Sequence, residues 1–448
     1  MLAVPLAAMV ASSVASAAQP QGPSWKIAER IEVEQVPSGF PVGFSLLTHG
    51  SRQYAAYYDA AHQMTVATRL LGERKWQTQK LESKVGWDSH NYLTMAVDAA
   101  GALHLAGNMH CVQLIYFRTE TPGDITTLKR LPMTGQQEAR CTYPIFLRDA
   151  AGRLVFQYRD GGSGNGSQIF NVYDAAAKTW SRMLQTPLFD GEGKRNAYLQ
   201  GPVVGPDRLF HVVWVWRETP DCATNHDLSY ARSRDLVHWE TAAGQPLKLP
   251  MTLKTAGLIV DPVPTGGGMI NGGQKLVFDA KKRPLIAYHK SDAAGNMQVY
   301  VARFEGDRWN RQVLTTWTKP VTFSGGGSMP FIGIGVSPPQ RLGDGIWAVH
   351  YRHRDYGSGV VTFSDTTLRP EPAKVTPQRP EYPAELSRPE LVFDQIGVQQ
   401  TGDQGDSGDP AVRYVMTWET LPANHDHQRT GPLPPAATLR VIKLVRNE

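Results

Sequence analysis

The chain has 448 residues, enough for two or three ordinary domains or for one large all-β fold. Only 19% of the residues are charged, and the net charge is +5. The sequence lacks the Lys/Arg runs of nucleic-acid-binding proteins, but this mild positive charge is compatible with an anionic ligand. The 42 Gly, 32 Pro, 11 Trp and 16 Tyr favour many short strands joined by tight turns. No window has the apolar period of an amphipathic helix.

The N-terminus is apolar and ends in Ala15-Ser16-Ala17, the small-x-small form of a signal-peptidase site. We therefore predict a signal peptide at 1–18, one mature domain at 19–448, and a secreted or periplasmic protein. No Lys or Arg precedes the apolar run, so a poor signal is the alternative. No other stretch is long enough for a membrane span, and we expect no membrane partner.

Two hairpin patterns alternate along the chain. In the first, a strand and a polar turn precede a Trp that begins the return strand, at 66–81, 171–184, 228–240 and 301–314. In the second, an Asp/Gly turn precedes an alternating apolar strand, at 97–107, 147–158, 204–216, 278–289 and 342–351. The second pattern recurs every 50 to 75 residues or so, and two hairpins make a four-stranded unit. This period predicts a single seven-bladed β-propeller of four-stranded antiparallel blades.

The candidate site is organised around 141–166, which reads as a hairpin with Tyr143 and Arg159 on adjacent strands before a glycine-rich turn. His90 enters an earlier strand, and His110 follows the next one. Tyr198 enters the following blade. Loops at one mouth of a propeller bring residues of successive blades together, so these side chains are expected to converge on one ligand.

Four stretches carry a family resemblance: SHNYLTMAVDAAGALHLAGNMH, CTYPIFLRDAAGRLVFQYRDGGSGNG, NAYLQGPVVGPDRLFHVVWVWRET and NHDLSYARSRDLVHW. Together they resemble the seven-bladed propeller polysaccharide lyases with BNR-like repeats. That group includes ulvan lyases and rhamnosyl-glucuronate lyases that act on gum arabic and arabinogalactan side chains. The resemblance covers 85–240, and the later blades share only the repeat pattern.

The resemblance implies that His90 and Tyr143 carry out the proton chemistry and that Arg159 neutralises the substrate carboxylate. It also implies that His110 and Tyr198 complete the pocket. Asn165 in the glycine-rich turn is a further candidate for substrate binding, although Asn also favours the left-handed geometry of such turns.

Lyases of this kind remove the C5 proton of a uronate and expel the oxygen on C4. The adjacent carboxylate must be neutralised first, and the planar fork of Arg159 matches it. Two assignments are open. Either His90 is the base and Tyr143 the acid, which the lower ordinary pKa of histidine favours slightly, or Tyr143 has both roles and His90 braces the carboxylate.

A structural zinc ion is a further possibility, because His211, Cys222, His226 and His289 include a Cys-x3-His pair. β-Elimination itself requires no cofactor. Of the three cysteines, Cys111 and Cys141 are a possible disulfide pair, and three buried thiols are the alternative. Trp214 and Trp216 alternate with Val, which favours core packing over sugar stacking.

The sequence therefore predicts a polysaccharide lyase that cleaves a sulfated or unsulfated rhamnosyl-α-1,4-glucuronate linkage and leaves an unsaturated uronate. The expected partner is an acidic polysaccharide, without nucleic acid, and the protein is expected to be a monomer. A sialidase-like hydrolase is the first alternative, because SRDLVHWE resembles an Asp-box turn, although we find no cluster of three arginines. A non-catalytic carbohydrate-binding propeller is the second.

Overall fold

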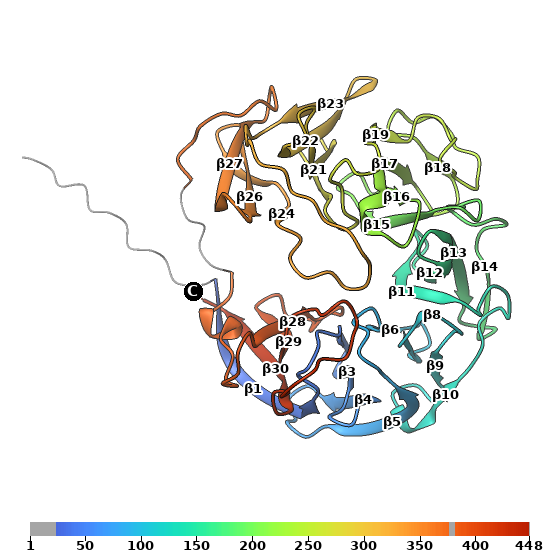
Figure 1. Cartoon of the computed structure of the whole chain (residues 1–448). Coiled ribbons are helices and arrows are strands. Elements are labelled where there is room, and N and C mark those ends of the chain that lie inside the picture. Colours follow the sequence, from blue (N-terminus) through green and yellow to red (C-terminus); the bar gives the residue numbers. More distant parts are fainter. Residues whose placement is uncertain (1–23, 376–380, 448) are drawn as a thin grey trace, which may run out of the picture.

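The computed structural model describes residues 24–375 and 381–447, which form seven antiparallel sheets arranged in a ring (Figure 1). The predicted signal peptide at 1–18 lies outside the described residues. Helical structure in the described part is limited to three short 3-10 helices, η1 (Ile125–Thr127), η2 (Cys222–Thr224) and η3 (Ala384–Ser387). No helix in this part of the chain is long and apolar enough to cross a membrane.

The sheets follow one another in chain order around the ring. The first contains β2 (Ser45–His49), β3 (Arg52–Tyr58), β4 (Gln63–Leu70) and β5 (Gln77–Lys84). The second contains β6 (Leu93–Val97), β7 (Leu103–Gly107), β9 (Tyr116–Thr119) and β10 (Leu128–Arg130). The third contains β8 (His110–Val112), β11 (Cys141–Arg148), β12 (Leu154–Gly162), β13 (Asn165–Asp174) and β14 (Thr179–Arg182).

The next three sheets continue this pattern. The fourth contains β15 (Asn196–Val204), β16 (Phe210–Arg217), β17 (Asn225–Ser233), β18 (Trp239–Glu240) and β19 (Ile259–Asp261). The fifth contains β20 (Lys275–Phe278), β21 (Pro284–Ser291), β22 (Met297–Glu305) and β23 (Arg308–Val313). The sixth contains β24 (Ile334–Val336), β25 (Gln340–Gly343), β26 (Ile346–His353) and β27 (Gly357–Ser364).

The seventh sheet joins the two ends of the chain. It contains β28 (Gly397–Gly402), β29 (Val412–Thr420), β30 (Ala437–Arg446) and the N-terminal strand β1 (Trp25–Val36), which pairs with β30 from Trp25↔Arg446 to Val36↔Ala437. The first and last strands of the described chain therefore stabilise each other.

Apolar clusters pack most neighbouring sheets together. Tyr57 of the first sheet and Met416 of the seventh belong to one cluster, and Trp214 and Trp216 are 0% and 1% exposed in the cluster between the third and fourth sheets. The prediction that these two tryptophans are core residues is confirmed. Among residues 24–375 and 381–447 no such cluster joins the sixth and seventh sheets.

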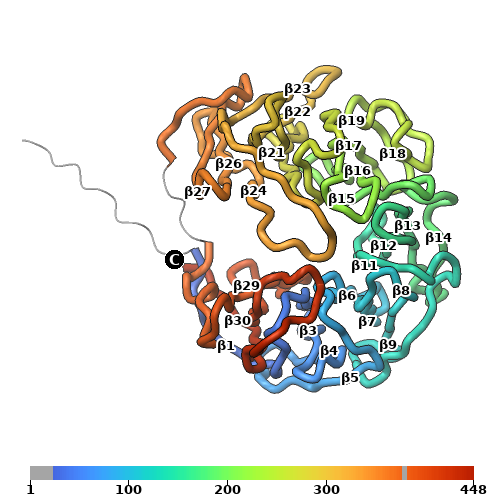
Figure 2. The backbone as a smooth tube through the Cα atoms, viewed as in Figure 1, coloured from blue at the N-terminus to red at the C-terminus, as the bar shows by residue number. Residues whose placement is uncertain are grey.

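Two long loops, one between the fifth and sixth sheets and one within the seventh, reach towards the centre of the ring (Figure 1). Loop 314–333 connects β23 to β24, and loop 421–436 connects β29 to β30. In the tube view the first runs into the middle of the ring and approaches the second (Figure 2). The backbone N–H of His425 donates to the carbonyl of Ser328 at 3.1 Å, so the two loops are in contact.

Both hairpin patterns in the sequence are confirmed. The four Trp hairpins are β4–β5, β13–β14, β17–β18 and β22–β23, and the five Asp/Gly turns join β6–β7, β11–β12, β15–β16, β20–β21 and β25–β26. In three of these turns a buried aspartate, Asp98, Asp149 or Asp279, accepts two backbone N–H groups. Oδ1 of Asp98, for example, lies 2.9 Å from the amides of Ala100 and Ala102. Residues 398–410, whose Gly and Asp content predicts a surface loop, form a loop only in part, because β28 occupies the first of them.

We expect Asp98→Ala to lower the free energy of unfolding by about 2 kcal/mol or more, because it leaves two turn amides without an acceptor. Asp98→Asn keeps the acceptor oxygen and is expected to lose less. Urea titration checks both, with the exposed Asp307→Ala as control. Equal stability of Asp98→Ala and the wild type would contradict this role.

Candidate active site

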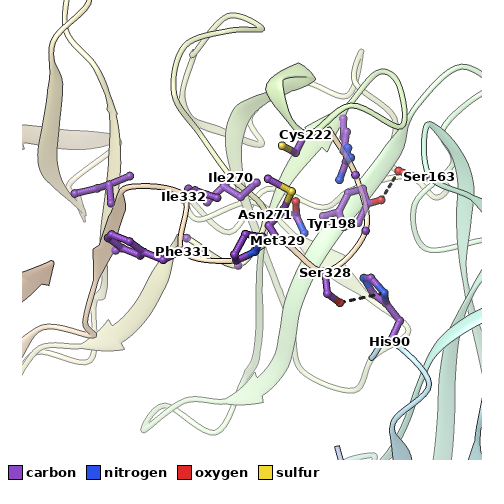
Figure 3. Close-up of a pocket in the computed structure, with 18 of the residues that line it drawn as sticks. His90, Ser163, Tyr198, Cys222, Ile270, Asn271, Ser328, Met329, Phe331 and Ile332 are labelled. Atoms are coloured by element: carbon purple, nitrogen blue, oxygen red, sulfur yellow. Dashed lines mark hydrogen bonds between the residues drawn. The ribbon is translucent and has the colours of Figure 1, made fainter. Parts of the chain in front are cut away.

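A pocket of about 530 Å³ opens near the centre of the ring. Its walls come from the second to sixth sheets and from loop 314–333 (Figure 3). One wall carries the polar residues His90, His110, Tyr143, Tyr198 and Arg217, and the opposite wall is apolar, with Ile270, Met329, Phe331 and Ile332. Its volume is typical of a site for one or a few sugar rings or another small ligand.

A bulge in β11 directs Tyr143 into this pocket. The pairing of β11 with β12 shifts register between Thr142 and Ile145, and Pro144 has no N–H to donate to the ladder. Tyr143 has a φ of 57°, which is unfavourable for a side chain of this size. Such strain is found where a side chain is held for function, and here it places the phenol against Tyr198 and His90.

Arg159 lies on β12 behind these two tyrosines. Its guanidinium stacks at 4.9 Å from the ring of Tyr143 and 5.9 Å from that of Tyr198, and Arg159 is 2% exposed. Its Nη atoms contact Thr142 Oγ1 at 3.1 Å, Cys111 Sγ at 3.3 Å and Tyr198 OH at 3.4 Å. None of these groups is a carboxylate, so within the described chain the buried guanidinium has no carboxylate partner.

The structure thus changes the geometry predicted for Arg159. It does not line the pocket, and it reaches a ligand only through the tyrosine rings in front of it. Space for its side chain comes from Gly166, where a Cβ would lie 2.7 Å from Cδ of Arg159. The glycine at position 166 is therefore required for the packing of Arg159.

The turn itself contributes Ser163 to the pocket. Gly162 pairs with Asn165 across a two-residue turn, Gly164 has a φ of 82°, and the Ser163 hydroxyl lies 2.7 Å from Tyr198 OH. Asn165 does not line the pocket, and its Oδ1 accepts the Gly162 N–H at 3.0 Å. It shapes the turn, so substrate contact by Asn165 is not supported.

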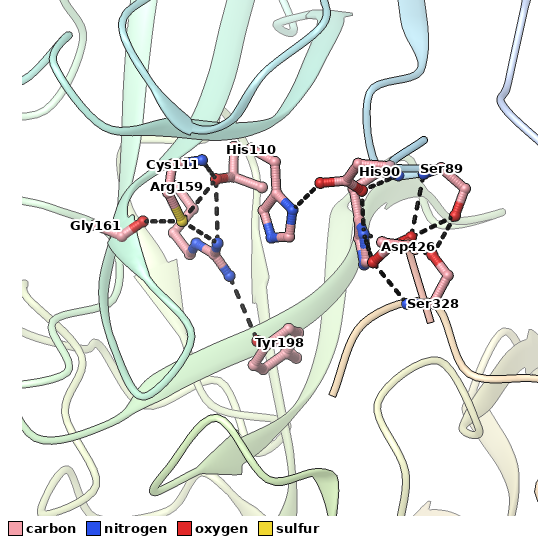
Figure 4. Close-up of polar contacts among 11 residues, drawn as sticks. Ser89, His90, His110, Cys111, Arg159, Gly161, Tyr198, Ser328 and Asp426 are labelled. Atoms are coloured by element: carbon pink, nitrogen blue, oxygen red, sulfur yellow. Dashed lines mark hydrogen bonds and ion pairs between the residues drawn. The ribbon is translucent and has the colours of Figure 1, made fainter. Parts of the chain in front are cut away.

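His90 and His110 lie side by side on the pocket wall and share one carboxylate. Their ring centroids are 4.4 Å apart, and Asp88 contacts Nδ1 of His90 at 2.8 Å and Nδ1 of His110 at 2.5 Å (Figure 4). Because Nδ1 of each ring is occupied, Nε2 is left for a ligand. Asp88 was missed in the sequence, although its place two residues before His90 was an available indication.

A second carboxylate reaches His90 from loop 421–436. Oδ2 of Asp426 lies 3.0 Å from His90 Nδ1, and the Ser328 hydroxyl lies 3.5 Å from the same nitrogen. No pattern in the sequence indicated either residue, because both come from loops more than two hundred residues away from His90.

The two carboxylates change the charge expected of His90. Burial lowers the pKa of His90, but hydrogen bonds and charge from Asp426 and Asp88 outweigh burial and raise the pKa to about 9. His90 is therefore an imidazolium at neutral pH. Burial raises the pKa of Tyr143 above its ordinary value, while the nearby Arg159 and Arg217 act in the opposite direction.

The described residues that line the pocket include Arg217 and Lys275 but neither Asp nor Glu. Arg217 donates to the backbone carbonyls of Thr219, Pro220 and Gly325, and Lys275 Nζ donates to the carbonyl of Gly272 at 2.7 Å. Burial lowers the pKa of Lys275. The pocket surface is thus cationic, which favours an anionic ligand.

The four residues predicted to bind zinc are not brought together. His211 contacts Asp207 and Tyr230, and His226 contacts Glu218 and Asp227, so both rings are fully engaged elsewhere. Cys222 and His289 do line the pocket. In the described part of the chain the one group with metal-like spacing is Asp88, His90 and His110, whose contacts are accounted for as histidine–carboxylate hydrogen bonds. All three cysteines are free thiols, so Cys111 and Cys141 do not pair.

A model of the BNR repeat-containing family matches residues 52–317, which is more than half of the chain. The chain belongs to this family. The BNR-repeat protein is also 38% identical over 78 residues to the long isoform of ulvan lyase from Pseudoalteromonas sp. (strain PLSV), and 36% identical over 78 residues to the short isoform from Alteromonas sp. (strain LOR). Those segments are 16% of this chain and 8% and 15% of the two relatives.

Solved structures resemble the BNR-repeat protein over nearly its whole length. Polysaccharide lyase Uly1 aligns with a TM-score of 0.59 at 13% identity, covering 94% of this chain and 99% of the other. A PL25 ulvan lyase bound to -[GlcA(1-4)Rha3S]- aligns with a TM-score of 0.53 at 12% identity, covering 92% and 96%. At this identity the alignments establish a shared fold. The family resemblance predicted from 85–240 is confirmed.

Of the predicted site residues, His90, His110, Tyr143 and Tyr198 meet at one pocket, and Arg159 lies directly behind the two tyrosines. Residues of successive sheets therefore meet at one pocket.

The raised pKa of His90 predicts a pH dependence of stability. A group whose pKa is higher in the folded state contributes stability that is complete below its ordinary pKa, about 6.5, and is lost as the pH rises through about 9. We therefore expect the Tm difference between the wild type and His90→Gln to be largest near pH 5 to 6 and to shrink towards pH 10. Thermal unfolding across this range checks it, with His49→Gln as an exposed control. A pH-independent difference would contradict the ion pairs of His90.

Proposed function

We propose that this BNR-repeat protein is a polysaccharide lyase that cleaves beside a uronate residue by β-elimination. We further propose that the seven sheets are the blades of a closed β-propeller, with the pocket at one mouth of its central channel. The whole-length similarity to Uly1 supports the propeller, and the β1–β30 pairing supplies closure within the last blade.

The observation that carries this proposal is a cationic pocket without a lining carboxylate. Arg217, Lys275 and the imidazolium of His90 lie on its surface, and Arg159 lies behind it. A glycoside hydrolase of the usual kind needs two carboxyl groups across the scissile bond. Tyr143 and Tyr198 line it together with three histidines, His90, His110 and His289, which suits removal of a carbon-bound proton next to an anion.

In the proposed mechanism, His90 contacts the uronate carboxylate as an imidazolium and stabilises the enolate-like intermediate. His110, oriented by Asp88, lies beside it. This assignment follows the second of the two alternatives left open by the sequence, because Asp88 and Asp426 favour the protonated form of His90, which suits contact with a carboxylate. Arg159 contributes positive charge from behind the tyrosine rings.

Tyr143 would then act as both base and acid. Its phenolate takes the C5 proton, the electron pair forms the C4–C5 double bond, and the oxygen on C4 leaves with the proton returned by the same phenol. Burial disfavours the phenolate, so the positive charges of Arg159 and Arg217 are needed to lower that cost. Tyr198 and Ser163 hold the neighbouring hydroxyl network.

The proposed substrate is a glycan with a rhamnosyl-α-1,4-glucuronate linkage, as in ulvan or arabinogalactan side chains, sulfated or not. Support comes from the ulvan lyase names of the relatives and from the -[GlcA(1-4)Rha3S]- ligand in one neighbouring structure. The proposal includes a secreted or periplasmic location, where a large polysaccharide is accessible, and a monomeric protein.

Incubation with ulvan and with gum arabic tests the activity. We expect ultraviolet absorbance from a new C4–C5 double bond with at least one of them. Reducing ends without this absorbance would indicate hydrolysis, and binding without either product would indicate a carbohydrate-binding propeller. Either result would refute the lyase proposal.

Tyr143→Phe removes the proposed proton-transfer group, and we expect it to lower kcat by about 100-fold or more. Tyr382→Phe, which removes a phenol contacting Arg413 at the surface, is the matched control and should leave kcat unchanged. Retention of most activity by Tyr143→Phe would rule out the assigned role.

Lys275→Met removes one positive charge from the pocket wall while keeping much of the side-chain volume. We expect KM for the acidic glycan to rise by about 5- to 10-fold, with kcat within about twofold, since a loss of about 1.4 kcal/mol in binding is tenfold. The exposed Lys281→Met is the control. An unchanged KM would mean that Lys275 does not contact an anionic part of the substrate.

A further inference from the structure

We propose that Asp426 is a positioning residue of the active site, which reaches across from loop 421–436 to hold His90 in its working orientation. This inference rests on the proposed function, because it concerns the residue assigned to the uronate carboxylate. It adds the C-terminal part of the chain to a site whose other candidates come from the second to sixth sheets and loop 314–333.

The first support is the sharing of His90 Nδ1 by two carboxylates. Asp88, two residues before His90, contacts this nitrogen at 2.8 Å. Asp426, from the C-terminal part of the chain, contacts it at 3.0 Å. Asp88 is also bonded to His110, so it serves two rings. Among the described residues, the Asp426 carboxylate is hydrogen-bonded to no histidine other than His90. Its hydrogen bond therefore orients the His90 ring alone.

The second support is that Asp426 is itself held in place. Its Oδ1 accepts the Ser89 backbone N–H at 3.1 Å and the Ser89 hydroxyl at 3.0 Å. Its Oδ2 accepts the Ser328 backbone N–H at 2.8 Å, and the hydroxyls of Ser89 and Ser328 also contact each other (Figure 4). A carboxylate with this many fixed donors has little freedom, so it can fix its partner.

The third support is where the contact occurs. The sixth and seventh sheets share no apolar cluster among the described residues. Loop 314–333, which leads into the sixth sheet, meets loop 421–436 of the seventh sheet at Ser328 and Asp426. Gly327 makes the approach possible, since a Cβ there would lie 2.5 Å from the carbonyl oxygen of His425. Packing of the two loops is thereby coupled to the orientation of His90.

The electrostatics agree with this geometry. The charged and titratable groups that face His90 are Asp88, Asp426, His110 and Tyr143. Burial raises the pKa of Asp426, but hydrogen bonding and charge from His90 outweigh burial and lower it to about 2. The pair is therefore ionised on both sides at neutral pH.

Asp426→Asn tests the inference because it keeps the shape and an acceptor oxygen but removes the charge. We expect kcat on the cleaved glycan to fall by about 10-fold or more, with KM within about twofold. Asp426→Glu should recover part of kcat. Asp394→Asn, at an exposed carboxylate that accepts a hydrogen bond from the Gln395 amide, should match the wild type.

A second readout does not depend on activity. NMR titration of the histidine rings, with His90→Gln used to assign the signal, should show His90 titrating about one pH unit or more lower in Asp426→Asn than in the wild type. Ser89→Ala leaves the charge of Asp426 in place and removes the hydroxyl contacts of Ser89 with Asp426 and Ser328. It should therefore lower kcat less than Asp426→Asn, and it tests the inference if Asp426→Asn folds poorly.

An unchanged kcat in Asp426→Asn, or a loss of kcat without any change in the titration of His90, would overturn the positioning role. Absence of glycan cleavage by the wild type would instead refute the proposed function. In that case the NMR titration still decides whether Asp426 holds His90.

Discussion

The rest of the site depends on the buried guanidinium of Arg159, which has no carboxylate partner among residues 24–375 and 381–447. An unpaired buried charge is costly, and here only aromatic faces and neutral polar groups offset it. Arg217 is held by backbone carbonyls in the same way. The site therefore keeps positive charge that a bound anion can neutralise, at the expense of stability in its absence.

The carboxylates of the site are placed where they do not cancel this charge. Asp88 contacts Nδ1 of both histidines, Asp426 contacts Nδ1 of His90, and neither carboxylate forms an ion pair with Arg159 or Arg217. They convert His90 into a further cation at the pocket surface. Two kinds of cation result: a guanidinium that acts through tyrosine rings, and an imidazolium that can contact the ligand.

Much of this could be predicted from the sequence because the signals are local. Each hairpin repeats a Trp return strand or an Asp/Gly turn, so the strands and their four-stranded grouping follow from short segments. The convergence of His90, His110, Tyr143 and Tyr198 follows once successive sheets are placed around one centre. The exchange of β1 into the last sheet has no such local signal.

The remaining features depend on contacts between distant segments. Asp426 and Ser328 come from loops whose sequences carry no motif, and their meeting point is set by the packing of the ring. The predicted zinc site is an error of the opposite kind, in which a sequence spacing indicated a site that the structure does not form. Cys222 and His226 have a spacing typical of zinc ligands, but the His226 ring is hydrogen-bonded to Glu218 instead. The position of Arg159 behind Tyr143 likewise depends on the bulge in β11. In the sequence, Pro144 is a weak indication of such a bulge.

The central claim is that the pocket recognises a uronate carboxylate. The most direct measurement is calorimetric binding of the slow Tyr143→Phe variant to a glucuronate-containing oligosaccharide and to the same oligosaccharide with its carboxylates reduced to alcohols. We predict a loss of affinity of about 10-fold or more for the reduced glycan. Equal affinity for the two glycans would contradict the account.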